Sequence, residues 1–585
     1  MADKELEKYE KKRQKEHDKF EAERKKWKQQ ETKKRVQKSS KYNTTLLFKI
    51  AAVAVSLAIV LGIVGIYASS YAIPARFYRA LTVEKMKVYE PEWVFHFYTE
   101  YMNVANTAAQ YAQYGLSSLV GLDLAVSPFG QESPYPAGDD ENGPKLTWDA
   151  FLHQRTNLAL QTGRAVYAEA LKAGVTLSEE AQKEIDEGME KLREDARQYG
   201  VSVSAMLRMN YTPGITERFY RGMFERDAVV AAFREQKQEE MRGKYTDDML
   251  KKEYDEDPSA YDLVDLRIQP FSKEKLALGE GESVDAFDAR QEAANAEKKK
   301  EAEAFLAAAG TEDAFIAAAK ALADKAWEEQ QAAAEDPEGD TPPAYDEAQT
   351  LALHLKKEDV GSRYQSEPMA GWAFDTARKA GDRDVIETES AFYAVYIARA
   401  PYAPVTVDFY TLHVPVATDE YAGPEEAEQA KEIARERAEE ILAGWKKDGG
   451  TKEAFVERIR AYAREEEDPQ AEDPDLGLNK AAKPGEMVDP IDHWIFAKGR
   501  KAGDCEIIDN EDGFTLVYLA SQNEDDFVWK SEIADRHVTE DYEAYLQALL
   551  LQYKVEENPL GIDASLKAAQ RLCDNFVLSY ANYNG

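Results

Sequence analysis

One stretch of the sequence occurs twice, and this repeat constrains the fold more than any other feature. Residues 372–398 read WAFDTARKAGDRDVIETESAFYAVYIA, and residues 494–520 read WIFAKGRKAGDCEIIDNEDGFTLVYLA. The two segments align without a gap and share 13 of 27 positions, among them Trp, Phe, Arg-Lys-Ala-Gly-Asp and Val-Tyr. Similarity at this spacing predicts two tandem domains of one design.

Each copy is expected to form a small α+β domain. A short helix carries Trp and Phe, a glycine at its C′ position (Gly381 or Gly503) ends it, and a hairpin with an alternating strand follows. Each copy also opens with a strand, predicted at residues 263–268 and 405–416. A long amphipathic helical stretch lies between the opening strand and the short helix, at residues 424–464 in the second copy.

The region before the repeats has helical periodicity. Apolar residues recur three and four positions apart in four segments, which predicts an all-helical lobe: 92–112, 147–173, 178–199 and 215–245. A Pro/Gly-rich loop is expected around residues 127–144, and a flexible low-complexity loop at 332–345. Residues 539–554 are expected to form a C-terminal helix that returns to this lobe.

Residues 46–68 form a long apolar run, LLFKIAAVAVSLAIVLGIVGIYA. The 19 residues after Lys49 carry no charge, close to the roughly 20 needed to cross a bilayer as a helix. A cleaved signal peptide is the alternative, but more than forty residues precede the run. We therefore expect a transmembrane signal anchor at residues 46–70, with the chain a single-pass protein of the cell membrane.

The N-terminal tail sets the expected orientation. Residues 1–42 contain 16 Lys and Arg against 9 Asp and Glu, which predicts a cytoplasmic N-terminus and an extracellular body. Two roles for the tail remain open: attraction to anionic lipids, or a topology signal alone.

Charge and composition exclude several classes of function. The net charge of -36 argues against nucleic acid as a partner. Two cysteines, without a metal-ligand spacing, predict neither a disulfide framework nor a metal site, and we expect no cofactor. The sequence contains no Gly-x-Ser-x-Gly, His-Glu-x-x-His or P-loop motif, so it gives no indication of a hydrolase or a nucleotide-binding protein.

The second copy contains Leu412-His413-Val414, Asp475-Leu476-Gly477 and the segment GEMVDPIDHWIF at residues 485–496, and through these motifs it resembles a parvulin-type peptidyl-prolyl isomerase domain. Leu412-His413-Val414 is similar to the His-x-Leu strand of that family, and Asp475-Leu476-Gly477 matches its Asp-Leu-Gly. Residues 485–496, GEMVDPIDHWIF, follow the family pattern Gly-x-Met-x-x-Pro-Phe-x-x-x-x-Phe, with Ile491 at the first Phe. The whole arrangement resembles membrane-anchored foldases of the PrsA and SurA type, in which a helical chaperone lobe accompanies parvulin domains.

This resemblance implies a set of site residues. His413 and Asp468 take the positions of catalytic residues, while Met487, Ile491, Phe496 and Thr515 take substrate-binding positions. Ile491 replaces a pocket phenylalanine, and Thr515 replaces a second histidine. In the first copy Arg267 is assigned to the position of His413 and Tyr393 to that of Thr515, so this copy is expected to bind without catalysis. His413 on a strand is also compatible with an ordinary core residue.

The resemblance implies the following organisation: a basic cytoplasmic tail (1–45), a transmembrane anchor (46–70), a SurA-like helical lobe (71–250), a degenerate parvulin-like domain (251–402), a second parvulin-like domain (403–525) and a C-terminal helix with its tail (526–585). The fold class is therefore α+β with a transmembrane helix.

The expected function is that of a membrane-anchored chaperone or foldase for unfolded or exported polypeptides, with weak or lost prolyl isomerase activity. Whether the chain forms a homodimer stays open. The alternative is a non-catalytic envelope scaffold that uses the same domains to bind one partner.

Overall fold

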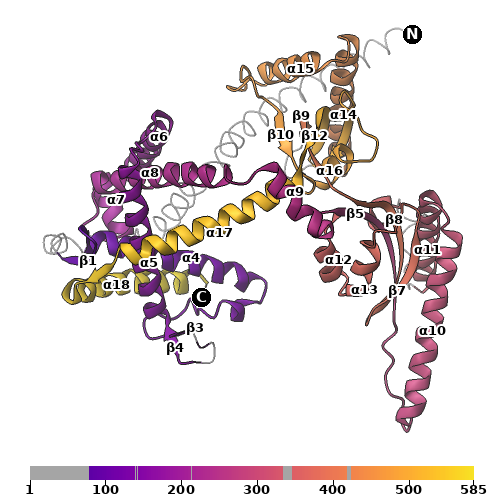
Figure 1. The fold of residues 1–585 in the computed structure, drawn as a ribbon, viewed down its shortest axis with the longest axis horizontal. Helices are drawn as coiled ribbons and strands as arrows, with labels where there is room; N and C mark the ends of the chain where they lie inside the picture. The colour runs from indigo at the N-terminus through magenta and orange to yellow at the C-terminus, as the bar shows by residue number, and fades with distance from the viewer. Residues whose placement is uncertain are drawn as a thin grey trace, which may run out of the picture. The chain divides into compact units, whose positions relative to one another are not determined.

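The computed structural model describes residues 78–584 apart from 139, 141–142, 213, 334–344, 418–422 and 511. Within this part the fold is α+β, with 15 α-helices and four small antiparallel sheets. The chain divides into two compact units (Figure 1). We call residues 78–245 with 535–584 the lobe, and residues 246–534 the tandem unit; the boundary near residue 534 falls within helix α17.

The lobe is built mainly of helices. Its elements in chain order are β1 (Arg79–Val83), β2 (Met86–Tyr89), α4 (Glu90–Gln113), η1 (Ser117–Leu119), β3 (Glu132–Pro136), β4 (Lys145–Thr147), α5 (Trp148–Lys172), α6 (Glu179–Gln198), α7 (Val203–Asn210), α8 (Glu217–Arg242), the larger part of α17 (Val528–Gln552), β13 (Val555–Glu557) and α18 (Pro559–Asn584). The four helices predicted from periodicity are present as α4, α5, α6 and α8. Ser178 caps α6, since its Oγ accepts a hydrogen bond from the Ala181 N–H at 3.1 Å.

The prediction that the lobe is all-helical was wrong. Strands β13, β1 and β2 form a three-stranded sheet, and β3, inside the expected Pro/Gly-rich loop, pairs with β4 directly after it. The sheet depends on a strand from the far end of the chain, with Val555 opposite Val83. Strands of three to five residues give a local periodicity too short to detect, and their pairing is long-range.

The core of the lobe lies between α4, α5 and α18. The rings of Trp93, Tyr98 and Tyr101 on α4 are almost fully buried, and the Tyr101 ring meets that of Phe576 on α18 edge to face at 5.6 Å. The first turn of α18 passes close to β1, because a Cβ on Gly561 would lie 1.8 Å from the Arg79 carbonyl oxygen. Only glycine fits this approach.

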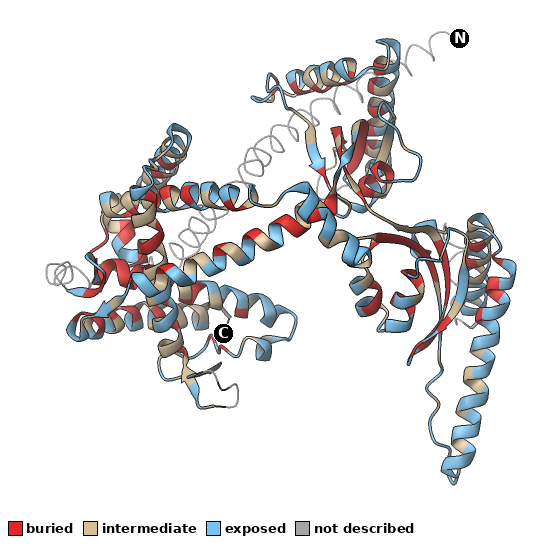
Figure 2. Cartoon of the chain, viewed as in Figure 1, coloured by how far each residue is buried: buried red, intermediate tan, exposed pale blue. Residues whose placement is uncertain are grey.

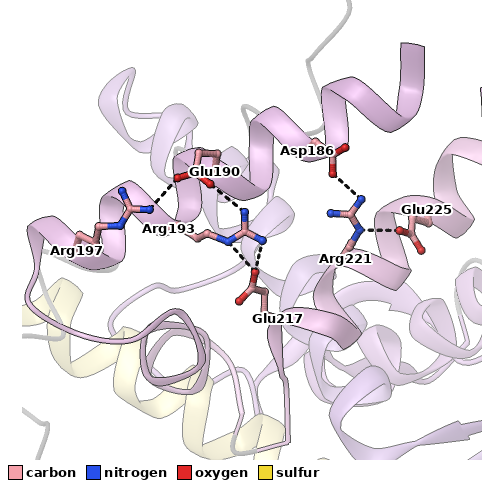
Figure 3. Close-up of polar contacts among 7 residues, drawn as sticks. All are labelled: Asp186, Glu190, Arg193, Arg197, Glu217, Arg221 and Glu225. Atoms are coloured by element: carbon pink, nitrogen blue, oxygen red, sulfur yellow. Dashed lines mark hydrogen bonds and ion pairs between the residues drawn. The ribbon is translucent and has the colours of Figure 1, made fainter. Parts of the chain in front are cut away.

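Helices α6 and α8 are joined by charged side chains (Figure 3). Arg193 on α6 donates from Nε and Nη2 to Glu217 on α8 at 2.9 and 2.6 Å. Arg221 on α8 reaches back to Asp186 on α6 at 2.6 Å. These groups are open to solvent, so each pair stabilises the contact only weakly.

The tandem unit contains two modules of the same topology. Its elements are α9 (Asp247–Glu256), η2 (Pro258–Ala260), β5 (Leu263–Ser272), α10 (Val284–Ala308), α11 (Glu312–Ala333), η3 (Glu347–Thr350), β6 (Leu351–Leu355), α12 (Lys357–Arg363), α13 (Glu367–Ala373), β7 (Arg383–Glu387), β8 (Ala391–Tyr402), β9 (Val405–Pro415), α14 (Pro424–Lys447), α15 (Lys452–Glu465), β10 (Leu478–Ala482), α16 (Asp489–Ile495), β11 (Cys505–Asn510) and β12 (Gly513–Phe527). The first module runs from β5 to β8 and the second from β9 to β12.

The two sheets have equivalent strand orders, β6-β5-β8-β7 and β10-β9-β12-β11. Each has one helix pair on one face and a short Trp-containing helix on the other. Figure 2 shows buried residues concentrated on the strands of both sheets, whereas α10 is mostly exposed. The repeated segments therefore occupy the same place in two copies of one small α+β fold.

The repeated Arg-Lys-Ala-Gly-Asp sequence forms the same turn in both modules. Gly381 and Gly503 have φ of 95° and 96°, and their N–H groups donate to the carbonyls of Ile397 and Leu519, both at 2.8 Å. The prediction that these glycines cap the short helices at C′ was wrong, since α13 already ends at Ala373. They provide the left-handed residue of the turn that leads into β7 and β11.

The repeated Trp and Arg also contact one another. The Arg378 guanidinium lies 4.8 Å from the centre of the Trp372 ring, and that of Arg500 lies 4.2 Å from the Trp494 ring. This stacking is a cation–π contact. It explains why the repeat keeps both residue types.

The predicted transmembrane anchor at residues 46–70 lies outside the described residues, as do residues 334–344 of the expected flexible loop. No helix among the described residues has the length and apolar character needed to cross a membrane. Even α17 contains Lys530, Asp535 and Arg536 within its span, and such charges are costly in hydrocarbon.

The predicted fold class and localisation are therefore corrected. The structure supports an α+β protein and gives no support for a single-pass membrane protein. The expected orientation, with a cytoplasmic tail and an extracellular body, depended on the anchor and loses its basis with it.

Candidate functional site

Two of the predicted site residues lie on neighbouring strands of the second module. His413 on β9 is directly opposite Thr515 on β12 in antiparallel register. Directly opposed side chains share one face of a sheet. His413 Nδ1 accordingly lies 2.9 Å from Thr515 Oγ1. The structure thus brings together two residues that the sequence resemblance assigned to one site.

Two further polar residues complete this group. Asn510 on β11 donates from Nδ2 to Thr515 Oγ1 at 2.7 Å, and Asp512 Oδ1 lies 3.7 Å from His413 Nε2. Thr515 is buried, whereas the His413 side chain is 21% exposed and that of Asp512 82% exposed. The group is therefore closed towards the sheet and open to solvent at the imidazole.

The polar group has one arrangement that pairs each of these donors with an acceptor. Asn510 donates to Thr515, the Thr515 hydroxyl donates to His413 Nδ1, and the imidazole proton sits on Nε2 towards Asp512. Such a group can orient a substrate carbonyl or amide without a covalent step. The Thr515 hydroxyl supplies a hydrogen bond to the imidazole, but unlike a histidine it cannot carry a positive charge at neutral pH.

The predicted pocket residues are part of a core. Ile491 and Phe496 are only 8% and 9% exposed, and they pack with Phe409, Val517 and Leu519 between the sheet and α16. Met487 is partly buried against the same cluster. These side chains lie on the sheet face that carries His413, but their surface is largely covered.

Asp468 lies apart from this group, in the turn after α15. Its Oδ1 accepts from the Gln470 N–H at 2.8 Å, and its backbone N–H donates to the Ala463 carbonyl. Its contacts are those of a residue that stabilises its own turn. The carboxylate near His413 is Asp512, which sequence reasoning missed because no pattern marks the residue before a strand as part of a site.

The first module lacks the polar pair. Tyr393 is opposite Pro270 on β5, so Pro270, and not Arg267, takes the place of His413. Arg267 instead faces α11, where its Nε donates to Glu312 Oε1 at 3.0 Å. The assignment of Arg267 was wrong by three residues, because a single strand without an alignment does not reveal its register.

Sequence reasoning also missed His354, which contacts residues of both modules. His354 on β6 has a left-handed φ of 54°, and its N–H donates to Asp265 Oδ1 at 2.9 Å. Its Nδ1 lies 2.9 Å from the Tyr402 hydroxyl, and its ring meets that of Phe496 in the second module at 5.6 Å. The only sequence signal is a histidine within the alternating segment Leu-Ala-Leu-His-Leu at 351–355.

The lobe has a buried cluster of charges beside a small cavity. Glu92 on α4 accepts hydrogen bonds from Arg164 at 2.6 Å and Arg226 at 2.8 Å. The cavity next to them, of about 40 Å³, is also lined by His96 and Asp227. Burial lowers the pKa of His96 and raises that of Asp227 to about 6. A space of this size holds water rather than a substrate.

Comparison of the chain with known protein families and with curated proteins gives no match in either case. Within the part of the chain that the structure describes, no group of three or more His, Cys, Asp or Glu side chains is arranged to hold a metal ion. The candidate site therefore consists of His413, Thr515, Asn510 and Asp512, and the family resemblance remains an expectation from the sequence.

Proposed function

We propose that this protein is a chaperone or foldase that binds unfolded polypeptides, with weak or lost peptidyl-prolyl isomerase activity in its second module. The observation that carries the proposal is the His413–Thr515 pair on neighbouring strands of a repeated α+β module. The sequence resemblance assigns these two residues to the positions of the paired active-site histidines of parvulins, and this supports the proposal.

Isomerisation of an X-Pro bond has a barrier of roughly 18–20 kcal/mol and needs no covalent step. The enzyme must hold the proline ring in an apolar pocket and favour the twisted amide over the planar one. Thr515 supplies a hydrogen bond but no second imidazole, and Ile491 and Phe496 are mostly covered. Both features favour binding over fast catalysis.

Two assays test the proposal on the full chain. The first measures suppression of aggregation of a chemically unfolded protein, where we expect activity at stoichiometric amounts of the chain. The second is a protease-coupled isomerisation assay of an X-Pro peptide, where we expect a rate near the uncatalysed one. The proposal fails if the wild-type chain neither suppresses aggregation nor accelerates isomerisation.

Any residual isomerisation is assigned with a matched pair of variants. His413→Ala should abolish it, while His493→Ala, on α16 of the same module, should leave it unchanged. Equal rates in the two variants would remove His413 from the reaction.

A scaffold function is the second candidate, and the covered state of Ile491 and Phe496 favours it because an occupied core offers no proline pocket. Crosslinking in cell extract separates the two candidates. Many unrelated unfolded partners support the chaperone, and one stoichiometric partner supports the scaffold.

A further inference from the structure

The last hairpin of each module has the same backbone pairing but a different charge. Ser390 and Asp512 occupy the same position of the repeat. The Ser390 carbonyl accepts from the N–H of Lys273 at 2.8 Å, and the Asp512 carbonyl accepts from that of Val416 at 2.9 Å. Lys273 and Val416 each follow the opening strand of their module directly. The two hairpin turns can therefore be compared residue by residue.

The first module brings a cation to its own hairpin. Lys273 Nζ donates to Glu387 Oε1 at 2.7 Å and to the Thr388 carbonyl at 2.8 Å. The same ammonium lies 4.8 Å from the centre of the Phe392 ring. In the second module the apolar Val416 takes the place of Lys273. That hairpin therefore lacks the cation that its counterpart has.

Asp512 is the carboxylate that this difference leaves without a cation. Asp509, the counterpart of Glu387, is paired with Lys431 on α14 at 3.0 Å. Asp512 has no such pair, since no Lys or Arg of the described residues lies within ion-pair distance of it. Its side chain is 82% exposed, and its Oδ1 lies 3.7 Å from His413 Nε2. The candidate site thus has an exposed negative charge at its open side.

A second acceptor of the site also lacks a donor. The Asn510 amide donates from Nδ2 to Thr515 Oγ1, which places its Oδ1 beside the His413–Thr515 pair. Asn510 Oδ1 is buried and accepts no hydrogen bond from the described residues. Carboxylate and amide oxygens accept hydrogen bonds, and a cationic side chain donates them. The site therefore has more acceptors than its own donors fill, which suits a ligand that supplies N–H groups.

An acidic segment adjoins the same end of strand β9. Residues 465–475 contain seven Asp and Glu and no Lys or Arg. The segment meets the sheet where the Thr411 N–H donates to the Gly477 carbonyl at 2.9 Å. Thr411 and His413 are two residues apart and so share one face of the sheet. Three of the seven carboxylates are paired, with Arg437, Arg464 and Lys480. The remaining negative charge attracts cations towards this end of the sheet.

We infer that the candidate site binds polypeptide segments with a Lys or Arg beside the residues held at the His413–Thr515 pair, and that Asp512 contacts this cationic side chain. The inference rests on the proposed function, which supplies the polypeptide, and deepens it by naming the class of segment. The cationic part follows from the unpaired Asp512 and the acidic segment. An acidic or phosphorylated segment would meet like charge at both places, which disfavours its binding.

The test compares three fluorescein-labelled peptides by fluorescence anisotropy with the full chain. Their sequences are Gly-Lys-Phe-Pro-Lys-Gly, Gly-Gln-Phe-Pro-Gln-Gly and Gly-Glu-Phe-Pro-Glu-Gly, so only the charge of the flanking residues differs. We expect the Lys peptide to bind about fivefold more tightly than the Glu peptide at low salt, with the Gln peptide between them. The difference should shrink as salt is raised towards about 1 M, because salt screens exposed charges.

Two substitutions at Asp512 separate its charge from that of the chain as a whole. Asp512→Ser introduces the residue that the first module has in the same turn, and should weaken binding of the Lys peptide about threefold without weakening that of the Glu peptide. Asp512→Lys should reverse the preference. The control is Glu439→Gln, on an exposed position of α14, which covers the other face of the sheet. It removes the same unit charge and should bind all three peptides as the wild type does.

Each result decides between the site and its alternatives. Equal effects of Asp512→Ser and Glu439→Gln would assign the preference to the net charge of the chain and overturn the inference. Equal binding of the Lys and Glu peptides by the wild type would overturn it as well, while leaving polypeptide binding in place. Aggregation suppression by a wild type that binds none of the peptides would reject this site and leave the proposed function standing. Loss of both activities would reject the two together.

Discussion

His354 Nε2 lies 3.1 Å from Asp492 Oδ2, which joins strand β6 of the first module to helix α16 of the second. Both side chains are almost completely buried, at 7% and 5% exposure. The distance is that of an ion pair, but the angle is not that of a hydrogen bond, so Nε2 makes none with the described residues. The other Asp492 oxygen accepts from the Gly485 N–H at 2.8 Å.

Removing this carboxylate should destabilise the tandem unit. In Asp492→Ala the Gly485 N–H loses its acceptor and the buried His354 ring loses the neighbouring carboxylate, which costs about 1–3 kcal/mol. Urea unfolding followed by tryptophan fluorescence measures the change. Asp489→Ala, on an exposed position of the same helix, is the control and should change the unfolding midpoint much less. Equal losses in the two variants would show that the contact with His354 contributes nothing.

The turn glycine of the repeat gives a second prediction. Gly381→Ala places a Cβ on a residue with φ of 95°, and the strained backbone should cost about 1–2 kcal/mol of folding free energy. Gly371→Ala lies within α13, where a Cβ meets nothing within 4 Å, and should stabilise by about 0.5–1 kcal/mol. Thermal unfolding of the two variants should therefore shift in opposite directions. Shifts of the same sign would contradict the role assigned to the turn.

The sequence predicted what is local or repeated and missed what is long-range. Amphipathic periodicity located α4, α5, α6 and α8, and the repeat located two modules of one topology, because both signals lie in neighbouring residues. The pairing of β13 with β1 and the register of Arg267 were missed, since each is decided by partners far away in the chain. The side chains that face His413 followed from the family resemblance only for Thr515; Asn510 and Asp512 are placed by the hairpin between β11 and β12.

Cys505 should be an unreactive thiol in the folded chain. Burial raises its pKa to about 12, and the nearby Lys446 offsets this only in part. At pH 8.5 an ordinary thiol is about half ionised, so Cys505 should be alkylated by iodoacetamide on the order of a thousandfold more slowly. Peptide mass mapping measures the rate at Cys505 directly, and the same reaction in urea is the control. Rapid alkylation of the native chain would show that the strand carrying Cys505 opens readily.

Asp227 should make one identifiable contribution to the pH dependence of the stability of the lobe. Burial beside the small cavity raises its folded-state pKa to about 6, above the value of about 3.9 in an unfolded chain. Between these values the folded state holds a proton that the unfolded state has lost. The contribution of Asp227 to stability should therefore be largest near pH 4 and should be lost as pH rises through about 6.

The isosteric variant Asp227→Asn removes this dependence. It should be more stable than the wild type at pH 7, with a difference that disappears towards pH 4, where both side chains are neutral. Asp227 is an exposed residue beside the cavity, so the difference should be well below the ~3 kcal/mol that two pKa units give a fully buried group. Hydrogen exchange of the α5 and α8 amides at several pH values measures it. A difference between wild type and variant that stays constant from pH 4 to pH 7 would show that this carboxyl group does not titrate in the folded lobe as its surroundings require.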